Sequence, residues 1–414
     1  MTTDPIERLA NLKHEFGEHG GVNMSIEAST TFTVMKPDTM PALFAGQSSG
    51  REGCYLYGRH FNPTVFVLGR ELAALEGTEA AYCTASGMAA ISATILQLCA
   101  AGDHVVASNT LYGGTYALLH DYLPHKSGIT TTFVDINNPG AVAAAITDRT
   151  RMVYAESMSN PTLRVADIPR LAELAHARDL PLVIDNTFSP LLLSPGAYGA
   201  DIVVHSMTKF INGASDVIAG AVCASEAFIH DLMDLHTGSL MLLGPTMDPV
   251  TASKISLRIP HLPLRLTEHA RRAQVIAERL AERGCDVIYP GLPAHPDHAL
   301  LTQLRCEHYG YGGLLALNMG SVERANRLMD LLQNEQRFGY MAVSLGYSDT
   351  LMSCSASSTS SEMDEAALRE AGIMPGLVRM SIGYTGSLEQ RWRQLERVLN
   401  EVDSGAEGAV PLSG

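Results

Sequence analysis

Residues 202–209, Ile-Val-Val-His-Ser-Met-Thr-Lys, are the clearest example of a pattern that recurs in this chain: an apolar, strand-like run followed by polar residues. An apolar run rich in β-branched residues is typical of a buried strand, and here the run ends at His205 and is followed by polar residues. Similar apolar runs alternate with helix-like stretches from Asn62 to Ser225. This alternation indicates an α/β domain with a mostly parallel sheet.

Seven runs in this part of the chain are predicted to be strands and to form a mostly parallel seven-stranded sheet. They are Ala80–Cys83, His104–Ser108, Thr131–Asp135, Met152–Glu156, Leu182–Asp185, Ile202–His205 and Ala219–Ala224. The stretches between them have helical periodicity: Pro63–Leu75, Gly87–Cys99, Gly113–Tyr122, Ala141–Ile146 and Ile168–Ala177. Asn62 is a suitable N-cap for the first of these helices, because Pro63 follows it at the first helical position.

The rest of the chain has a different pattern and divides it into four predicted parts. Residues 1–61 are rich in Gly, Ser, Thr and Pro and are predicted to be an arm, and residues 62–249 form the larger domain. Residues 250–403 are predicted to form a smaller α+β domain, and residues 404–414 a loose tail. The smaller domain has helical stretches at Val250–Leu257, Leu266–Arg283, Val322–Gln333 and Ser387–Val402, and strand-like runs at Leu314–Met319, Met341–Leu345 and Leu377–Ile382. The serine-rich run Ser353–Ser361 is predicted to be a loop.

Composition narrows the classes of function. The 414-residue chain has 44 acidic residues against 29 Lys and Arg, a net charge of −15, which disfavours nucleic acid as a partner. Residues 1–10 lack the apolar run of a secretory signal, and the most apolar stretch, residues 87–102, is shorter than the roughly 18 residues of a membrane span. The seven cysteines are never spaced as C-x-x-C, which disfavours a disulfide framework and a metal site. We therefore expect small-molecule chemistry in a soluble cytoplasmic protein.

Lys209 is the first candidate for chemistry. A lysine placed directly after a buried strand can be desolvated, which lowers its pKa and makes its amine a nucleophile toward an aldehyde. The hydroxyls of Ser206 and Thr208 could meanwhile hold a phosphate. Taken alone, a surface lysine in a polar turn is the simpler interpretation.

Asp185 strengthens the first interpretation, because it ends another predicted strand with a carboxylate. Ligands of open α/β sheets bind at the carboxyl ends of the strands. A buried carboxylate is costly unless a cation pairs with it, and a protonated pyridine nitrogen would be such a cation. A helix N-cap is the alternative role for Asp185, but together with Lys209 the carboxylate favours a ligand site.

A run of small residues, Thr84 to Ala90, joins a predicted strand to a predicted helix. Backbone N–H groups at such a helix start can face a phosphate, and the helix dipole favours the negative charge. The chain has no Walker loop, and no G-x-G-x-x-G follows a predicted strand. By itself, a plain helix start explains this run.

Several motifs together resemble the cysteine/methionine-metabolism (trans-sulfuration) family of pyridoxal phosphate enzymes, which includes cystathionine γ-synthase, cystathionine γ-lyase, methionine γ-lyase and O-acetylhomoserine sulfhydrylase. They occur in the family's order from the arm to about Val402: Tyr57-Gly58-Arg59, Asn62-Pro63-Thr64, Ser86-Gly87-Met88, Tyr112-Gly113-Gly114-Thr115, Glu156 to Pro161, Asp185 to Phe188, Ser206 to Lys209 and Leu377 to Ser381. The resemblance implies the aspartate-aminotransferase-like fold type I and pyridoxal 5'-phosphate as cofactor. It also implies a homotetramer, a dimer of dimers whose arms contact neighbouring subunits.

The resemblance implies catalytic roles for Lys209, Tyr112 and Asp185. Lys209 would be the Schiff-base lysine, Asp185 the partner of the pyridine nitrogen, and Tyr112 the residue that stacks on the ring and assists proton transfers. The full set of implied cofactor-binding residues is Tyr57, Arg59, Ser86, Gly87, Met88, Tyr112, Asn160, Asp185, Ser206, Thr208 and Lys209. Arg379, with Ser344 nearby, would bind the substrate α-carboxylate, since an arginine fork matches a carboxylate.

Two departures from the family pattern bear on the substrate. The better-known methionine γ-lyases carry a cysteine two residues after the stacking tyrosine and a Lys-Asp pair near Asp234; this chain has Gly114 and Asp234-Leu235. The segment Leu240 to Met247 is apolar where substrate side chains approach in relatives, although packing between subunits explains it as well. Such an apolar entrance suits a thioether better than the second amino-acid head group of cystathionine.

The sequence therefore favours γ-elimination on a methionine-like amino acid, which gives a 2-oxo acid, ammonia and a thiol. The alternatives are γ-replacement on O-acetyl- or O-succinyl-homoserine, a cystathionine γ-lyase, and a γ-lyase for a non-sulfur substrate such as canavanine. A cofactor-binding scaffold without turnover is the alternative from another class, and the presence of Lys209, Asp185, Tyr112 and Arg379 argues against it.

Overall fold

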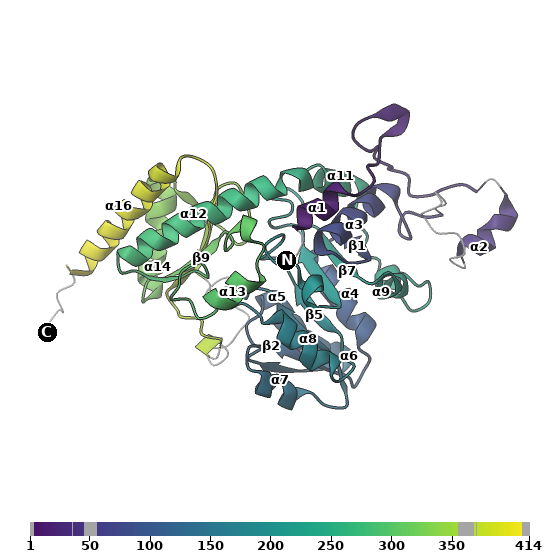
Figure 1. Cartoon of the computed structure of the whole chain (residues 1–414), viewed down its shortest axis with the longest axis horizontal. Helices are drawn as coiled ribbons and strands as arrows, with labels where there is room; N and C mark the ends of the chain where they lie inside the picture. Colours follow the sequence, from purple (N-terminus) through teal and green to yellow (C-terminus); the bar gives the residue numbers. More distant parts are fainter. Residues whose placement is uncertain (1–3, 35, 45–55, 355–367, 370, 408–414) are drawn as a thin grey trace.

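The computed structural model describes residues 4–34, 36–44, 56–354, 368–369 and 371–407. Its larger sheet has seven strands in the order β1-β7-β6-β5-β4-β2-β3 (Figure 1). The neighbours from β6 to β3 pair in parallel, whereas β7 runs antiparallel to both β1 and β6. The strands are β1 (Ala80–Thr84), β2 (His104–Ser108), β3 (Thr130–Val134), β4 (Thr150–Glu156), β5 (Leu182–Asp185), β6 (Ile202–Ser206) and β7 (Gly220–Ala224). The predicted mostly parallel seven-stranded sheet is confirmed.

The central strands are mostly apolar and buried, as expected for strands that have helices on both faces of the sheet. Side chains of α3 (Pro63–Glu76) and α8 (Ile168–His176) belong to the core on one face. Side chains of α4 (Gly87–Leu98) and α9 (Glu226–Leu232) belong to the core on the other. As predicted, the Asn62 side chain caps α3, accepting hydrogen bonds from the backbone N–H groups of Thr64 and Val65.

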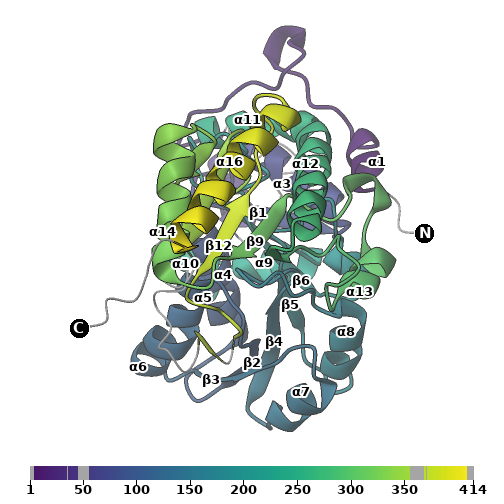
Figure 2. The same ribbon diagram turned by 90° about the vertical axis from the view of Figure 1, so that its left-hand side faces the viewer.

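A second, five-stranded sheet has the order β10-β11-β12-β9-β8 and is covered by α12, α14 and α16 (Figure 2). Its strands are β8 (Asp286–Ile288), β9 (Leu314–Asn318), β10 (Gly339–Met341), β11 (Thr350–Cys354) and β12 (Leu377–Ser381). This sheet and its helices form the smaller α+β part of the fold. The division of the whole chain at residues 61, 249 and 403 stays a prediction.

The remaining helices connect the strands or lie at the periphery. They are α1 (Pro5–Ala10), α2 (Met40–Phe44), α5 (Gly113–Ala117), α6 (Leu123–Ser127), α7 (Pro139–Ala145), α10 (Ser239–Leu243), α11 (Pro249–Ser256), α12 (Leu262–Glu282), α13 (His298–Leu304), α14 (Val322–Asp330) and α16 (Leu388–Glu407). Short 3₁₀ turns are η1 (Glu18–Gly20), η2 (Pro37–Thr39), η5 (Pro195–Tyr198), η6 (Ile259–His261) and η7 (Glu307–Tyr309), and η4 (Leu118–Tyr122) and η8 (Leu331–Glu335) are π-helical.

Three expectations about the second half of the chain were wrong in detail. The predicted strand Met341–Leu345 is reduced to Gly339–Met341, because Ser344 has a φ of 112°, which an extended strand cannot accommodate. The short strand β8 and the strand β11 were not predicted, and β11 includes the first two residues of the predicted serine-rich loop; residues 355–361 lie outside the described residues. Helix α16 extends to Glu407, so residues 404–407 of the predicted tail are helical.

The first part of the predicted arm is tied to the larger sheet domain. Arg8 of α1 donates to the backbone carbonyls of Ala74 and Leu75 at 2.7 and 2.6 Å, and these residues lie at the end of α3. Asn62 Nδ2 donates to the carbonyl of Glu27 at 2.8 Å. Among the described residues, no helix is long and apolar enough to cross a membrane.

Candidate active site

Three polar side chains lie at the carboxyl ends of neighbouring strands. Glu156 ends β4, Asp185 ends β5 and Ser206 ends β6, and Glu156 and Asp185 are register partners in the parallel ladder. The Asp185 side chain is buried, and its Oδ1 accepts a hydrogen bond from the backbone N–H of Thr187 at 2.9 Å. Burial raises the pKa of the Asp185 carboxyl, and the hydrogen bonds to Thr187 oppose this rise. A cation bound against Asp185 would relieve the cost of burying the carboxylate.

The start of α4 packs closely against the end of β6. Ser86 is the N-cap of α4, and its Oγ accepts from the backbone N–H of Ala89 at 3.1 Å. A Cβ added to Gly87 would lie 2.7 Å from Cβ of Ser206, so only glycine allows this approach. Met88 follows on the same helix. The arrangement brings hydroxyls and a helix N-terminus together, as a phosphate site requires.

Thr208 has a contact that the sequence did not indicate. Its Oγ1 accepts from the backbone N–H of Ala219 at 2.9 Å and lies 3.3 Å from the Ala219 carbonyl oxygen. These hydrogen bonds join the loop after β6 to the residue before β7. The structure therefore gives Thr208 a role in shaping the loop, and its contact with a phosphate stays a prediction.

Lys209 lies in the loop after β6 and points toward the smaller domain. Its Nζ donates a hydrogen bond to Oγ of Ser344 at 2.9 Å. Burial, together with the nearby positive charge of Arg379, lowers the pKa of Lys209 to about 8. At neutral pH, a much larger share of this amine is therefore uncharged than in an ordinary lysine.

Arg265 of α12 holds the backbone directly after the lysine. Its Nη1 donates to the carbonyl of Phe210 at 2.7 Å, and its Nη2 donates to the carbonyl of Ile211 at 2.9 Å. Burial lowers the pKa of this guanidinium. No sequence motif marks Arg265, because its partners are backbone carbonyls.

Arg379 comes from β12 of the smaller sheet and is 2% exposed. Its Nη1 donates to Oδ1 of Asn160 at 3.1 Å, and its Nη2 donates to the carbonyl of Ser344 at 2.9 Å. Its Nε is a buried donor that has no hydrogen-bond partner among the described residues. Burial lowers its pKa to about 10, so the guanidinium is still charged at neutral pH. The structure thus brings Lys209, Ser344, Arg379 and Asn160 into one cluster.

Tyr112 is the N-cap of α5 and is 43% exposed. Its backbone N–H donates to Oε1 of Glu156 at 2.6 Å, which ties the start of α5 to the sheet edge. The Tyr112 ring lies over Gly114, because a Cβ at residue 114 would be 2.6 Å from Cε1 of the ring. Gly114, the predicted departure from the better-known methionine γ-lyases, therefore permits this position of the ring.

Tyr57 and Arg59 lie away from this cluster within the chain. Arg59 Nη1 donates to the carbonyl of Met241 in α10 at 2.7 Å, and its guanidinium lies 5.8 Å from the centre of the Tyr57 ring. Tyr57 is 44% exposed. Their predicted reach into a neighbouring subunit stays a prediction, as a single chain does not test it.

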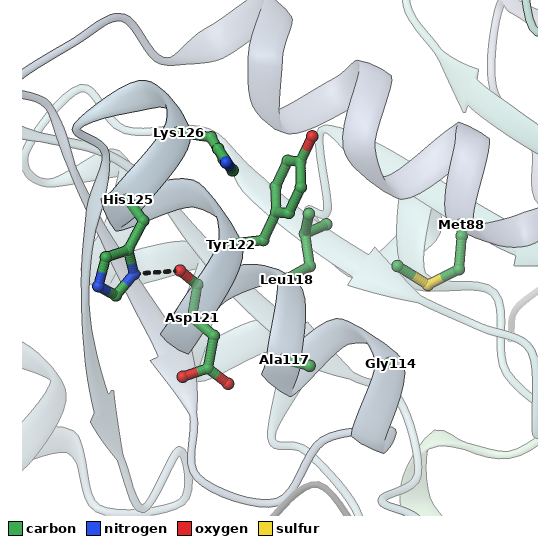
Figure 3. Close-up of a pocket in the computed structure, with 8 residues that line it drawn as sticks. All are labelled: Met88, Gly114, Ala117, Leu118, Asp121, Tyr122, His125 and Lys126. Carbon is green, nitrogen blue, oxygen red and sulfur yellow. Dashed lines mark hydrogen bonds between the residues drawn. The ribbon is translucent and has the colours of Figure 1, made fainter.

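Two cavities have residues of the candidate site in their walls. The first, of about 500 Å³, lies beside Met88 and Gly114 and extends along η4 to Lys126. Figure 3 shows that the His125 imidazole Nδ1 donates to the Asp121 backbone carbonyl at its far end. The second cavity, of about 570 Å³, is the one that reaches Lys209's neighbours; its lining residues are Thr208, Ser215, Asp216, Val217, Ile218, Tyr340, Ala342, Val343, Ser344, Tyr347 and Leu351.

The two substrate-related segments of the sequence occupy other places. Oδ1 of Asp234 accepts from the backbone N–H groups of His236 and Thr237, both at 2.8 Å, so Asp234 stabilises a turn. Leu240 and Met241 are buried in their own chain, whereas Leu242 is 57% exposed. The segment Leu240–Met247 does not line the cavity beside Lys209, and its predicted role at a substrate entrance gains no support.

These residues fit pyridoxal phosphate. The Lys209 amine can react with an aldehyde, the Asp185 carboxylate can hold a cationic ring nitrogen, and the close approach of Gly87 to Ser206 forms a cradle for a phosphate. Arg379 Nε remains as a donor for a further anion. Glu156 is the site residue to which the sequence gave no role, although it ends a predicted strand with a carboxylate just as Asp185 does.

Comparisons with known proteins give relatives that match nearly the whole chain. The chain is 60% identical over 395 residues to methionine gamma-lyase of Arabidopsis thaliana, covering 95% of this chain and 90% of the relative. It is 37% identical over 371 residues to L-methionine gamma-lyase of Pseudomonas putida, with 88% and 90% covered. A solved cystathionine gamma synthase from Xanthomonas oryzae, in complex with aminoacrylate and cysteine, matches with a TM-score of 0.86 at 31% identity, covering 98% of this chain and 99% of that chain. With a family model for Cys/Met metabolism PLP-dependent enzymes matching residues 8–388, the chain belongs to that family.

Proposed function

We propose that this enzyme carries out γ-elimination on methionine or a methionine-like amino acid, giving a 2-oxo acid, ammonia and a thiol. The proposal rests on two side chains that lie close together, the Lys209 amine and the buried Arg379 guanidinium, which has a spare donor. They accompany Asp185, which ends β5 at the carboxyl edge of the larger sheet. The 60% identity to a methionine gamma-lyase over 95% of the chain supports the choice of substrate.

The cofactor would be held at the carboxyl edge of the larger sheet. When bound, pyridoxal phosphate supplies an electrophilic carbon that condenses with amines and a ring that withdraws electrons from the substrate α-carbon. Asp185 would hold the ring nitrogen in its protonated form, while Ser86, Gly87, Met88 and Ser206 would surround the phosphate. Asn160 would orient the ring from its edge, and Tyr112 would cover one face.

Lys209 and Tyr112 would move the protons of the reaction. With a pKa of about 8, a useful share of the Lys209 amine is uncharged near neutral pH, so its Nζ can accept the α-proton of the substrate and carry it onward. Ser344 Oγ accepts a hydrogen bond from this Nζ and so orients the amine. Tyr112 Oη would donate a proton to the sulfur of the leaving thiol.

The substrate would be oriented at both of its ends. Arg379 would bind the α-carboxylate through its spare Nε–H and the adjoining N–H groups, a fork that matches two carboxylate oxygens. The walls of the cavity beside Thr208 and Ser344 are more apolar than polar. Among the described lining residues the charged one, Asp216, is paired with Arg258 at 2.6 Å. An uncharged thioether side chain fits such walls better than a second ammonium and carboxylate pair does.

A substrate panel tests the proposal. Methionine, homocysteine, cystathionine, O-acetylhomoserine and canavanine would be assayed for 2-oxobutanoate, ammonia and homoserine, with and without an added thiol. We expect 2-oxobutanoate and ammonia from methionine, and loss of this activity in Lys209→Ala. Release of 2-oxobutanoate only from O-acetylhomoserine would contradict the proposed substrate. A wild-type protein that stays colourless after addition of pyridoxal phosphate would contradict the cofactor site.

The second candidate is γ-replacement on an O-acylated homoserine. The similarity to the solved cystathionine gamma synthase, at 31% identity and nearly full coverage, favours it. In the same panel this function would give thioether products from O-acetylhomoserine only when a thiol is present, and no 2-oxobutanoate from methionine.

We also propose that the enzyme is a cytoplasmic homotetramer built as a dimer of dimers. Exposed apolar side chains on the arm and on α10, among them Phe44, Tyr57 and Leu243, provide surface that a neighbouring subunit can cover. The described cysteines are all free thiols, which suits a reducing compartment. Light scattering of the purified protein tests the assembly, because a monomer of 44.4 kDa would contradict it.

A further inference from the structure

Glu156 is a buried carboxylate that the proposed reaction does not use. It ends β4 beside Asp185 in the parallel ladder, and both side chains are buried. Because paired residues in neighbouring parallel strands point to the same face of the sheet, the two carboxylates face the same side. Burying two carboxylates side by side is costly, so the position of Glu156 calls for a compensating role.

The two oxygens of Glu156 bind two different loops. Oε1 accepts from the backbone N–H of Tyr112 at 2.6 Å, and Oε2 accepts from the backbone N–H of Asn160 at 3.2 Å. Tyr112 begins the helix that follows β2, whereas Asn160 lies in the loop that follows β4. One side chain therefore links the loops on two sides of the candidate cofactor site.

We propose that Glu156 is a positioning residue, which fixes Tyr112 and Asn160 relative to Asp185 by accepting hydrogen bonds from both of their backbone amides. The inference rests on the cofactor site proposed above, because Tyr112 and Asn160 would touch the face and the edge of the ring. Glu156 acts only through these two residues and has no contact of its own with the reacting atoms.

The charge environment fits this role. Burial and the negative charge of Asp185 raise the pKa of Glu156 well above its ordinary value, and the backbone hydrogen bonds from Tyr112 and Asn160 oppose this rise. The two amides thus favour the charged form of Glu156, against the effect of burial. A glutamine has the same shape, but its single carbonyl oxygen can serve only one amide, and its NH₂ group would face the N–H of the other.

The test uses the holoenzyme and the variants Glu156→Gln and Glu156→Asp. Glutamine keeps the length of the side chain, and aspartate keeps the charge but is too short to reach both amides. The matched control is Glu71→Gln, because Glu71 is half-buried and its pKa is also raised by desolvation, but its Oε1 accepts a hydrogen bond from Ser256 Oγ. Circular dichroism of the bound cofactor in its visible band reports how the ring is held, and it needs no turnover.

We expect both Glu156 variants to weaken this visible signal and to lower kcat by about 10- to 100-fold, the range expected when reacting groups are misplaced by about 1 Å. Glu71→Gln should change neither quantity, even if its thermal unfolding temperature falls. In a double-mutant cycle, Glu156→Gln and Tyr112→Phe should lower kcat by less than the product of their separate effects, since both act through Tyr112.

Two results would overturn the inference: a wild-type visible signal in both Glu156 variants, or fully multiplicative effects on kcat in the cycle. If Glu156→Gln does not fold, Glu156→Asp carries the same comparison. Failure of the proposed function is distinguishable from these results. In that case the wild type lacks γ-elimination, but the visible signal of its bound cofactor still responds to Glu156.

Discussion

The lowered pKa of Lys209 predicts how the apoenzyme captures its cofactor as pH changes. The pKa falls from 10.5 to about 8, mainly because the amine is buried and further because Arg379 is near. The amine reacts only when it is uncharged. At pH 7 the uncharged share is therefore about 10%, against about 0.03% for an ordinary lysine, an advantage of roughly 300-fold.

The assay is the rate at which apoenzyme gains the visible absorbance of covalently bound pyridoxal phosphate, at limiting cofactor concentration and from about pH 6 to pH 11. The same series with N-acetyl-lysine, divided by the uncharged fraction of its own amine, corrects for the ionisation of the cofactor itself. The corrected rate should rise about tenfold per pH unit and level off near pH 8. A rate that keeps rising to the ordinary lysine pKa of 10.5 would refute the argument that burial sets the pKa.

Replacing Arg379 extends the same measurement. Arg379→Gln removes the second cause of the shift, so the midpoint should move upward, toward the ordinary lysine value. Arg164→Gln is the control, since Arg164 pairs with Asp297 at 2.6 Å and does not contribute to the Lys209 shift. An equal movement in both variants would show that the midpoint reports a general loss of structure.

Three further predictions concern single side chains. Gly114→Ala should alter kcat or KM for methionine several-fold, because the new Cβ would lie 2.6 Å from Cε1 of Tyr112 and the ring must move. The thermal unfolding temperature should stay equal or rise, because alanine favours a helix over glycine by about 1 kcal/mol. Unchanged kinetics would contradict the ring position. Arg379→Lys should lower kcat/KM by about 100-fold, since a lost charge-assisted fork corresponds to about 3 kcal/mol; near-normal kinetics would exclude Arg379 as the carboxylate ligand. Asn62→Ala should lower the free energy of unfolding, measured by urea titration, by about 1 kcal/mol through loss of the α3 cap. It should also speed proteolysis of the arm in limited digestion, because the hydrogen bond to Glu27 is lost. An unchanged free energy of unfolding would contradict the capping role.

The larger sheet could be predicted because its strands are buried on both faces. The strand Leu182–Asp185 has three apolar residues followed by a carboxylate, so its end is visible in the sequence. The strands of the smaller sheet give weaker signals. Asp286–Ile288 has three residues, too few to show a period. The run Met341–Leu345 is strand-like in composition, but its chain turns at Ser344 through a φ of 112° that composition does not reveal.

The candidate site was predictable where strand ends meet and unpredictable where backbone atoms are the partners. Asp185 and Lys209 follow neighbouring strands, and the rule for ligand sites in open sheets places them together. Arg265 binds two carbonyl oxygens more than 50 positions away in the chain. Because every residue has a carbonyl, nothing in the sequence marks Phe210 and Ile211 as its partners. Arg59 differs from Arg265: a sequence motif marks it, but its predicted role depends on a second chain.

The hydrogen bonds from Arg265 to the loop after Lys209 have a consequence for how the enzyme becomes competent. Arg265 lies near the start of α12, whose later turns pack against the smaller sheet, so a single helix joins that sheet to the reactive loop. If the larger sheet forms before α12 docks, its lysine loop lacks the clamp. During refolding, the colour of bound pyridoxal phosphate should therefore appear only after α12 has docked, which makes the cofactor a reporter of domain assembly.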